Sequence, residues 1–216
     1  MRVNLLDRIK IISQTLMFAV IVAFISICYY TYESQSIAKA EEPKWTLPDF
    51  EHTNNQQFLD NVNQCVDYWY NTTTDILPVN REILLAQAAL ESGWGTSRFA
   101  NEGNNLFGIR TWTKTVPHMI PHGIKKWPGW GVKIFGSKCD SVKEYIRILN
   151  NHPAYEEFRT ARQNFFVQNM DPDPLVLIKK IGKFSTTSDY DKRVERIILK
   201  IRELEGTYAT DKELNK

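Results

Sequence analysis

The 216-residue sequence lacks the features of several protein classes. Three cysteines are too few for a small disulfide scaffold. Ten glycines and nine prolines exclude a collagen-like or low-complexity chain. Hydrophobic residues make up 43% of the chain and charged residues 24%, which excludes a disordered protein. No internal repeat is visible, so the length indicates one domain of ordinary size and one additional segment.

The sequence also has little net charge. It holds 27 Lys and Arg against 25 Asp and Glu, a formal charge of +2. Residues 1–40 contain four basic and two acidic residues, which leaves 23 of each in residues 41–216. Because nucleic-acid binding draws on an excess of Lys and Arg, we expect no nucleic-acid partner.

One long apolar run lies near the N-terminus. Residues 11–30 contain no charged side chain, and about 20 such residues suffice for a helix that crosses a bilayer. Arg2, Arg8 and Lys10 precede the run, and positive charge stays on the cytoplasmic side of a membrane. The sequence therefore predicts a cytoplasmic stub and a transmembrane anchor in residues 1–32, with the rest of the chain outside the cytoplasm.

A cleaved signal sequence is the alternative for the same segment. Residues 38–40, Ala-Lys-Ala, have the small-x-small pattern of a cleavage site, some eight residues beyond the apolar run. Both interpretations export the folded part. A polar linker with prolines is expected over residues 33–52, a folded domain over residues 53–210, and a polar tail over residues 211–216.

The hydrophobic pattern of the domain is mainly helical. Residues 54–70 have apolar side chains at spacings of three and four. Asn80 is a good N-cap for a helix over residues 81–91, which is apolar almost all round and hence buried, and Gly93 ends it. Further helices are expected over residues 142–150, 155–169 and 175–181. The string Ser188-Asp-Tyr-Asp191 is expected to open the last helix, whose apolar face runs from Val194 to Leu204.

Residues 107–137 differ from these helices. They hold three prolines and five glycines among β-branched and aromatic residues, which favours short strands and turns. The polar residues 101–106 before them are expected to form a loop. After them, Ser141-Val-Lys-Glu144 is a capping box that opens the next helix. The sequence thus predicts a mainly α domain with one small β-rich insertion.

Glu91 is the leading candidate for a catalytic residue. It ends the buried helix, where burial and the negative end of the helix dipole both raise the pKa of a carboxyl group. A raised pKa keeps a general acid protonated near neutral pH. The alternative is a solvent-facing Glu at a helix end.

The strings around Glu91 resemble a known family. Residues 86–97 (Ala-Gln-Ala-Ala-Leu-Glu-Ser-Gly-Trp-Gly-Thr-Ser) and residues 104–109 (Asn-Asn-Leu-Phe-Gly-Ile) are similar to the glucosaminidase domain of glycoside hydrolase family 73, and within it to the Bax-type proteins of Gram-negative bacteria. The resemblance covers about residues 80–204. It implies a lysozyme-like, α-rich fold with a small β-lobe. It also implies hydrolysis of the β-1,4 bond after N-acetylglucosamine in peptidoglycan, with Glu91 as the acid.

Glycoside hydrolysis usually takes two carboxylates. By resemblance the second is Asp140, where many relatives carry Glu, or else Asp140 supports the N-terminus of its helix. Glu102 is a loop alternative, whereas the capping box explains Glu144. Tyr190 matches a family Tyr that assists the active site, or else packs in the core. Without a second carboxylate, the acetamido group of the substrate can act as nucleophile.

Aromatic and amide side chains complete the predicted site. Sugar rings present apolar faces that stack on aromatic rings, so a glycan groove is expected between the helix end and the β-rich region. Core packing is the alternative role for Trp94 and Phe107. The alternative for Asn105 is to cap the turn before Leu106. The candidate substrate-binding residues are Trp94, Asn105, Phe107, Trp112, Trp127 and Trp130.

A metal site is the chemical alternative, and the sequence argues against it. His118 and His122 are four residues apart, but Pro117 and Pro121 interrupt any helix there, and no HExxH pattern occurs. We therefore expect neither a metal nor a cofactor. Cys65 and Cys139 can pair in an oxidising compartment, although nothing in the sequence brings them together.

The expected protein is a monomeric glycosidase whose partners are peptidoglycan glycan strands and, through the N-terminal segment, the membrane. The Gram-negative resemblance implies a single-pass inner-membrane protein with a periplasmic catalytic domain, or a free periplasmic enzyme if the signal is cleaved. The alternatives are a lytic transglycosylase or muramidase of lysozyme-like fold, and a non-catalytic glycan-binding scaffold.

Overall fold

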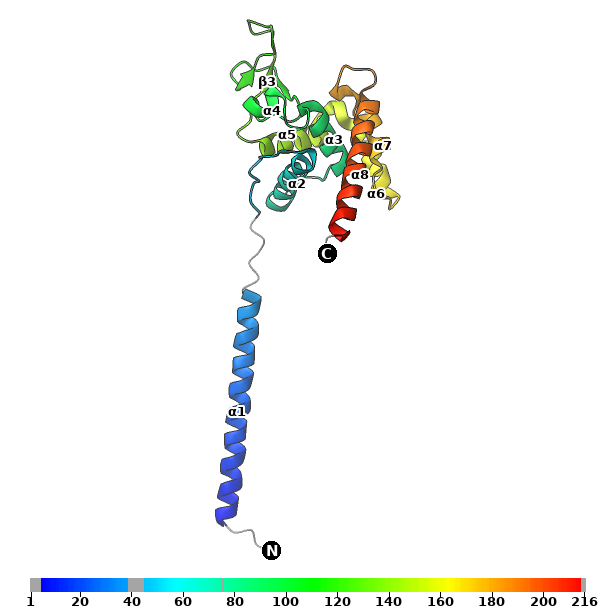
Figure 1. The fold of residues 1–216 in the computed structure, drawn as a ribbon. Coiled ribbons are helices and arrows are strands. Elements are labelled where there is room, and N and C mark those ends of the chain that lie inside the picture. Colours follow the sequence, from blue (N-terminus) through cyan, green and yellow to red (C-terminus); the bar gives the residue numbers. More distant parts are fainter. Residues whose placement is uncertain (1–4, 39–44, 75, 215–216) are drawn as a thin grey trace. The chain divides into compact units, whose positions relative to one another are not determined.

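The computed structural model describes residues 5–38, 45–74 and 76–214 of the chain. Side chains are described for residues 13–14, 16–32, 45–74 and 76–206. The chain divides into two compact units, Met1–Lys44 and Trp45–Lys216, which are taken separately below (Figure 1).

The first unit contains α1 (Leu5–Ala38), a helix of 34 residues. Its described side chains from Leu16 to Tyr32 are all exposed. The sequence predicts a transmembrane helix over residues 11–30, within α1; the side chains of Ile11, Ile12 and Thr15 lie outside the described ones. Among the residues that are described, no helix is at once long enough and apolar enough to cross a membrane, so the predicted span is not found there.

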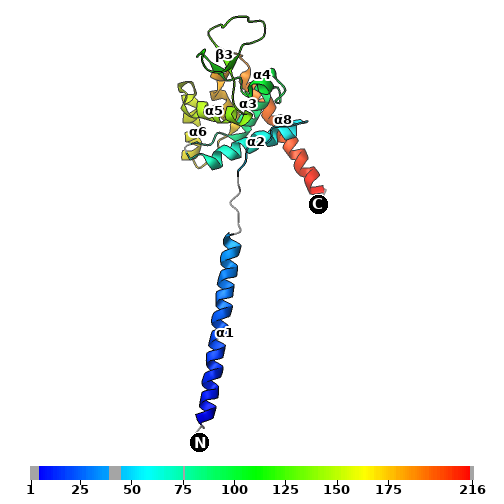
Figure 2. The ribbon, with the colours of Figure 1, turned by 90° about the vertical axis from the view of Figure 1, so that its left-hand side faces the viewer.

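The second unit is built around α3 (Arg81–Ser92). Helices α2 (Asn55–Thr72) and α8 (Tyr190–Leu214) pack against α3, and α5 (Lys138–Asn151) packs against α2. Figures 1 and 2 show α3 inside this helical body from two directions. Residues 83–89 of α3 are all buried, because neighbouring elements cover every face of the helix.

The ends of α3 are those that the sequence predicts. The Asn80 side chain accepts a hydrogen bond from the Ile83 backbone N–H, which satisfies one of the free donors of the first turn. Gly93 ends the helix in the left-handed region, at φ +59°. A glycine reaches this conformation without the steric cost that a Cβ atom brings.

The shorter helices complete the helical body. Residues with almost no exposed surface come from α2, α3, α5, α6 and α8 and form one core, so the prediction of a mainly α domain is confirmed. The remaining helices and turns are α4 (Arg98–Gly103), α6 (Glu156–Val167), α7 (Pro174–Leu177), and the 3-10 turns η1 (Pro153–Tyr155), η2 (Ile178–Lys180) and η3 (Gly182–Phe184).

Two predicted element boundaries are wrong. The expected loop over residues 101–106 begins inside α4, which the Ser97 side chain caps by accepting from the Ala100 N–H. Helix α5 starts at Lys138 with Ser137 as its N-cap, four residues before the predicted capping box. The buried Ser141 hydroxyl instead accepts from the Leu106 N–H and donates to the Lys138 carbonyl.

The predicted β-rich insertion is a small antiparallel sheet. It consists of β1 (Arg110–Thr111), β2 (His118–Met119) and β3 (Gly131–Lys133), in the order β1-β3-β2. Arg110 is opposite Val132, and Met119 is opposite the same residue from the other side. Position 131 requires a glycine, because a Cβ atom there would lie 2.6 Å from the His118 ring.

A disulfide between Cys65 and Cys139 joins α2 to α5. Their Cα atoms lie 5.0 Å apart although 74 residues separate them in sequence. The sequence leaves this pairing open, and the packing of α2 on α5 brings the two thiols together. Cys28, in the first unit, is free and exposed.

Candidate active site

Glu91 lies in the last turn of α3, where the chain turns sharply. Gly93, Trp94 and Gly95 follow it with φ values of +59°, +57° and +80°. The Glu91 side chain borders a cleft of about 400 Å³. The residues that line the cleft are Glu91, Phe107, Gly108, Ile109, Arg110, Trp112, Ile148, His152, Ala154, Tyr155, Lys183, Phe184, Ser185 and Thr186.

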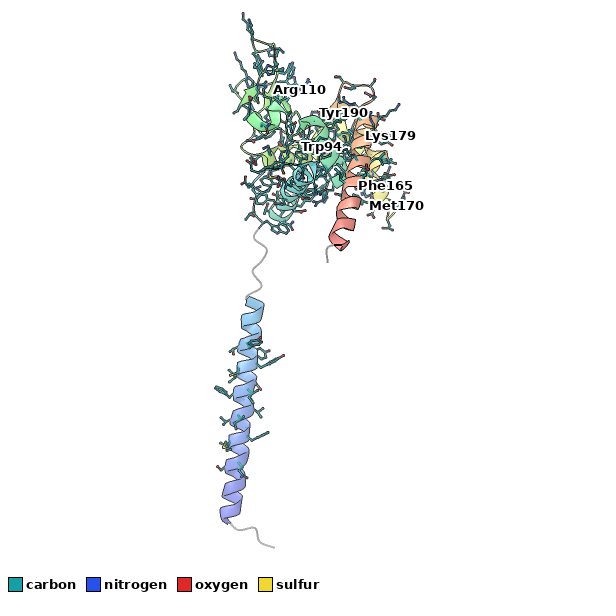
Figure 3. The ribbon with its side chains drawn as sticks, viewed as in Figure 1. Trp94, Arg110, Phe165, Met170, Lys179 and Tyr190 are labelled. Atoms are coloured by element: carbon teal, nitrogen blue, oxygen red, sulfur yellow. A yellow bond between two sulfur atoms is a disulfide. The ribbon has the colours of Figure 1, made fainter. Side chains whose placement is uncertain are left out.

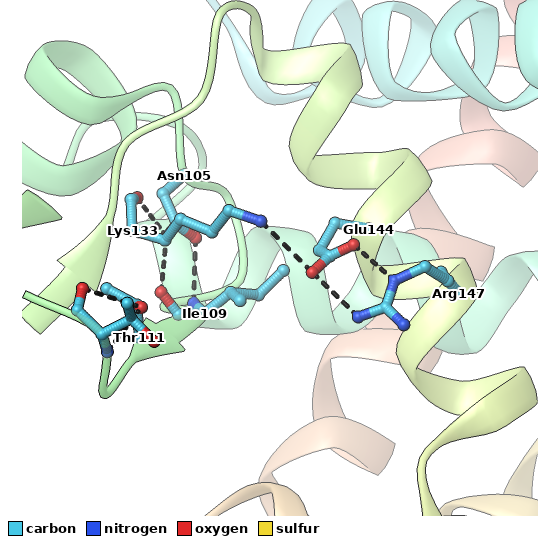
Figure 4. A network of polar contacts seen from close by, with 7 residues as sticks. Asn105, Ile109, Thr111, Lys133, Glu144 and Arg147 are labelled. Atoms are coloured by element: carbon cyan, nitrogen blue, oxygen red, sulfur yellow. Dashed lines mark hydrogen bonds and ion pairs between the residues drawn. The ribbon is translucent and has the colours of Figure 1, made fainter. Parts of the chain in front are cut away.

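The loop after α4 supplies one wall of this cleft. Asn105 is buried, and its amide donates to the carbonyls of Ile109 and Lys133, while its Oδ1 accepts from the backbone N–H groups of Phe107 and Ile109 (Figure 4). These four hydrogen bonds hold the turn that places Gly108 beside Glu91. A Cβ atom added to Gly108 would lie 4.0 Å from Glu91 Oε2. Both polar atoms of the Asn105 side chain are therefore used within the protein, and the turn that they hold follows Leu106, whereas the sequence alternative was a cap of the turn before Leu106.

A chain of hydrogen bonds through the core ends at the Glu91 carboxyl group. The Tyr145 hydroxyl donates to Gln87 Oε1, and Gln87 Nε2 donates to the Tyr190 hydroxyl oxygen at 2.6 Å. The Tyr190 hydroxyl in turn forms a hydrogen bond with Glu91. Because Gln87 already donates to Tyr190, the Tyr190 proton is free to point at the carboxylate.

Three of these side chains are almost fully buried. Gln87 and Tyr145 have no exposed surface, and Tyr190 retains 3%. Tyr190 begins α8 and Gln87 lies in α3, so the packing of α8 on α3 creates the contact. Figure 3 labels Tyr190 at the start of α8. The predicted placement of Tyr190 beside Glu91 thus follows from helix packing.

Burial raises the pKa of the Glu91 carboxyl above its usual range. The Tyr190 hydrogen bond and the positive charges of Arg193 and Arg110 oppose this rise and are smaller. Burial also raises the pKa of Tyr190, and the nearby Glu91 charge adds to that rise. Tyr190 is consequently a hydrogen-bond donor at neutral pH, and Glu91 holds its proton to a higher pH than an exposed Glu.

The structure does not bring Asp140 to this cleft. Its carboxylate accepts a hydrogen bond of 2.9 Å from the Ser137 hydroxyl, and its backbone N–H donates back to that hydroxyl. It lines a different cavity, of about 370 Å³, between β3, α5 and the connection from α2 to α3. Asp140 therefore lies in the first turn of α5, where it supports the Ser137 cap, and this is the alternative to a catalytic role.

Glu144 and Glu102 are likewise engaged elsewhere. Glu144 bridges β3 to α5 by pairing with Lys133 at 3.3 Å and Arg147 at 2.7 Å (Figure 4). Glu102 is exposed and pairs with Arg98. Among the described residues that line the cleft, Glu91 alone carries a carboxyl group.

The predicted aromatic residues divide into three groups. Phe107 and Trp112 line the cleft, with Phe107 buried and stacked on Tyr145, and with Trp112 71% exposed. Trp94 packs edge-on against Phe58 beside the core. Trp127 contacts the His118 ring and Trp130 lies under the Arg110 guanidinium, so both belong to the β-sheet region.

Several cleft residues were not predicted from the sequence. Arg110, His152 and Lys183 place positive or titratable groups around Glu91, and Tyr155 and Phe184 add rings. Arg110 directly follows the string that ends at Ile109, so its position beside that motif is a signal that was available. His152 and Lys183 come from distant loops, and no local pattern marks them.

Among the residues that are described, no group of three His, Cys, Asp or Glu side chains is placed to hold a metal ion. His118 is engaged in the β-sheet region, where its Nδ1 lies 2.7 Å from the Val116 carbonyl oxygen. The arrangement around Glu91 instead suits proton transfer in a cleft rimmed by positive charge.

A mainly helical domain with a buried carboxyl group at the edge of a cleft is compatible with a glycoside hydrolase. The chain belongs to the glucosaminidase family, because the family model described as mannosyl-glycoprotein endo-beta-N-acetylglucosaminidase matches residues 69–203. This match confirms the family predicted from the strings around Glu91.

Similar proteins are known in several bacteria. The chain is 35% identical over 112 residues to Protein bax of Escherichia coli (strain K12), which covers 52% of this chain and 38% of that protein. It is 31% identical over 140 residues to peptidoglycan hydrolase FlgJ of Vibrio parahaemolyticus, covering 59% of this chain and 42% of that protein. The chain thus spans about two fifths of the length of these relatives.

A solved structure supports the fold. The glycoside hydrolase domain of FlgJ from Salmonella typhimurium aligns with a TM-score of 0.54 and 20% sequence identity. The alignment covers 76% of this chain and 98% of that domain. A likeness at this level of identity shows a shared fold.

Proposed function

We propose that the chain is an exported peptidoglycan hydrolase that cleaves the β-1,4 bond after N-acetylglucosamine, with Glu91 as general acid. The observation that carries this proposal is the Glu91 carboxyl group, which lines the cleft and has a pKa raised by burial. The family match supports a glycoside hydrolase. The names of the FlgJ relatives support peptidoglycan as the substrate.

The proposed reaction begins with proton transfer. Neutral Glu91 gives its proton to the oxygen of the leaving sugar as the bond from that oxygen to the anomeric carbon breaks. The carboxylate that remains accepts the Tyr190 hydrogen bond and lies in the field of Arg193 and Arg110. These groups stabilise the charge that Glu91 acquires in the transition state.

The second catalytic group is proposed to belong to the substrate. Since the cleft offers no second carboxyl group among its described lining residues, the acetamido oxygen of N-acetylglucosamine attacks the anomeric carbon in place of a carboxylate. Water then attacks that carbon and releases the acetamido oxygen, and the water proton returns to Glu91. Asp140 takes no part in this scheme.

Export is supported by two independent features. Disulfides persist in oxidising compartments, and Cys65 pairs with Cys139. The apolar run of α1 follows Arg2, Arg8 and Lys10, which is the charge order of an export signal. Peptidoglycan lies outside the cytoplasm, so both features agree with the proposed substrate.

Digestion of purified peptidoglycan tests the proposal. The full chain is compared with Glu91→Gln, and the products are reduced with borohydride and identified by mass spectrometry. We expect new N-acetylglucosamine ends from the wild type and a loss of about 10²–10⁴-fold in rate in the variant, which is the usual contribution of a general acid. Glu157→Gln, an exposed residue paired only across the surface with Lys180, is the matched control.

Other products would change the assignment. New N-acetylmuramic acid ends, or their anhydro form, would make the protein a muramidase or a lytic transglycosylase. Binding to peptidoglycan without cleavage by any variant would make it a glycan-binding scaffold. Full activity in Glu91→Gln would contradict the proposed acid.

The second group is tested on a modified substrate. If the acetamido group attacks, N-deacetylated peptidoglycan resists cleavage at its deacetylated sugars, and Asp140→Asn cleaves the ordinary polymer within a few-fold of the wild-type rate. If Asp140 is the second carboxylate, Asp140→Asn loses activity as Glu91→Gln does.

A further inference from the structure

The segment from the last residue of α4 to the first two residues of α5 carries charge of one sign. Residues 103–139 contain six Lys and Arg and no Asp or Glu. The rest of residues 41–216 contains 17 Lys and Arg against 23 Asp and Glu. The neutral folded domain is therefore divided into a segment of +6 and a remainder of −6. We call residues 103–139, which include β1, β2 and β3, the cationic lobe.

Most of this charge is exposed. Arg110, Lys114, Lys125 and Lys126 are all exposed. Within the described part of the chain, no ion pair involves Lys114, Lys125 or Lys126. Figure 1 shows the loop that precedes β3 projecting away from the helical body. The charges of these three lysines are therefore not used in ion pairs between the described residues of the domain.

The other two cations of the lobe are held at the helical body, and Lys138 is itself the first residue of α5. Lys133 pairs with Glu144 of α5, and the Lys138 ammonium lies 5.1 Å from the centre of the Phe50 ring. Their charge is partly used in holding the lobe in place. The exposed lysines are thus the part of the lobe that is free to meet another molecule.

The cationic lobe is continuous with the cleft of Glu91. Arg110 and Trp112 belong to the lobe and also line the cleft. Figure 3 labels Arg110 on the β-strand side of the domain. Trp130 lies 4.2 Å beneath the Arg110 guanidinium, which fixes that cation at the cleft edge. The lobe therefore begins at the edge of the cleft, at Arg110 and Trp112.

We propose that the cationic lobe binds the peptide carboxylates of the same peptidoglycan strand whose sugars occupy the cleft. This inference rests on the proposed function. Peptidoglycan carries short peptides with free carboxylates along its glycan, so its charge is complementary to the lobe. At physiological salt the Debye length is about 8 Å, so only carboxylates close to the lysines are attracted strongly.

The proposed contact acts on the encounter between enzyme and wall. Exposed charges at the rim of an interface mainly change the rate of association and its dependence on salt. They add little to the stability of the complex once it has formed. The lobe should therefore orient the domain so that the cleft approaches the glycan, and its effect should fade as salt is added.

Binding of the full chain to purified sacculi tests this inference. All proteins carry Glu91→Gln so that the polymer is not cut, and binding is measured by co-sedimentation at increasing salt. The test variant is Lys114→Gln/Lys125→Gln/Lys126→Gln. The control removes the same charge elsewhere with Lys179→Gln/Lys180→Gln/Lys192→Gln. A second set of sacculi has its carboxyl groups converted to amides.

We expect the lobe variant to bind ordinary sacculi about tenfold more weakly at low salt, with a flatter salt dependence, while the control variant binds as its parent does. Amidated sacculi should bind the parent as weakly as ordinary sacculi bind the lobe variant. Equal binding by parent and lobe variant would overturn the inference. So would a lobe effect that persists on amidated sacculi, because another anion would then be the ligand.

This measurement separates the inference from the proposed function. Failure of the proposed function appears as absence of cleavage by the protein with Glu91 intact, whatever the binding. Failure of the inference appears as binding that ignores the lobe lysines or the carboxylates, whatever the cleavage.

Discussion

At Glu91, the burial that suits a general acid also opposes folding. In the unfolded chain this carboxyl group titrates at about pH 4.3, and in the folded protein its pKa is raised. The folded state therefore binds the proton more tightly than the unfolded chain. Its contribution to stability is fully present below the unfolded pKa and is lost as pH rises through the folded pKa.

Glu91→Gln removes this pH dependence. We expect the variant to be more stable than the wild type at neutral pH. The difference should shrink as pH falls, and it should level off well below the unfolded pKa, where the wild-type carboxyl group is neutral in both states. Urea denaturation at a series of pH values measures it. A difference that is independent of pH would show that Glu91 titrates alike in the folded and unfolded chains.

Tyr190→Phe separates two roles of one hydroxyl group. The ring stacked near Phe184 is kept, but Gln87 Nε2 loses its acceptor, and a buried donor left unpaired costs about 1–3 kcal/mol. Because the Tyr190 hydrogen bond lowers the pKa of Glu91, its loss should raise that pKa. The alkaline limb of the pH–rate profile should then move to higher pH.

A purely structural Tyr190 predicts a different result. The variant would then lose stability in urea while its pH–rate profile stayed where the wild-type profile lies. The two measurements together assign the hydroxyl to the site or to the core.

At the scale of the elements, one covalent link reinforces the packing of α2 against α5. The Cys65–Cys139 disulfide closes a loop of 74 residues. The Trp69 indole adds a hydrogen bond of 2.7 Å to the Cys139 carbonyl at the same contact. This contact holds the start of α5 against α2. Further along α5, Glu144 pairs with Lys133 and so joins the helix to β3.

Replacing both cysteines by serine should lower the free energy of unfolding by about 4 kcal/mol, because the cross-link restricts the unfolded chain. Urea denaturation of Cys65→Ser/Cys139→Ser measures the loss. Cys28→Ser, outside this unit, should leave the urea midpoint unchanged. An equal midpoint for the double variant and the wild type would contradict a stabilising link.

At the scale of the whole molecule, export determines the redox state of the cysteines. If the folded unit leaves the cytoplasm, its two cysteines pair and Cys28 alone stays a thiol. We expect one thiol to react with a maleimide-polymer in denatured cell extracts before reduction, and three after it. Three reactive thiols before reduction would place the domain in a reducing compartment and contradict export.

The arrangement of charge also belongs to the whole molecule. A domain that is neutral in total shows no reason to bind a polyanion when only its composition is considered. Its division into a cationic lobe and an acidic remainder becomes meaningful once β1 and the cleft are seen to share Arg110. The sign and size of the net charge alone therefore describe this protein poorly.

Structural features that depend on residues close together in the sequence can be predicted from the sequence alone. The two ends of α3 are predicted from Asn80 and Gly93, because a helix cap and a left-handed turn each involve residues within four positions of one another. Glu91 was found from its helix and from the family strings around it. The small β-rich insertion was predicted from its prolines and glycines, which exclude a long helix.

Contacts between side chains that are far apart in the sequence are seen only in the tertiary structure. Packing of α8 on α3 placed Tyr190 against Gln87, and packing of α2 on α5 paired Cys65 with Cys139. Asp140 lies in the first turn of α5, because the Ser137 cap starts that helix one turn earlier than the sequence pattern suggests. Such contacts join residues far apart in the chain, so their geometry depends on how the buried faces of the helices fit together rather than on local pattern.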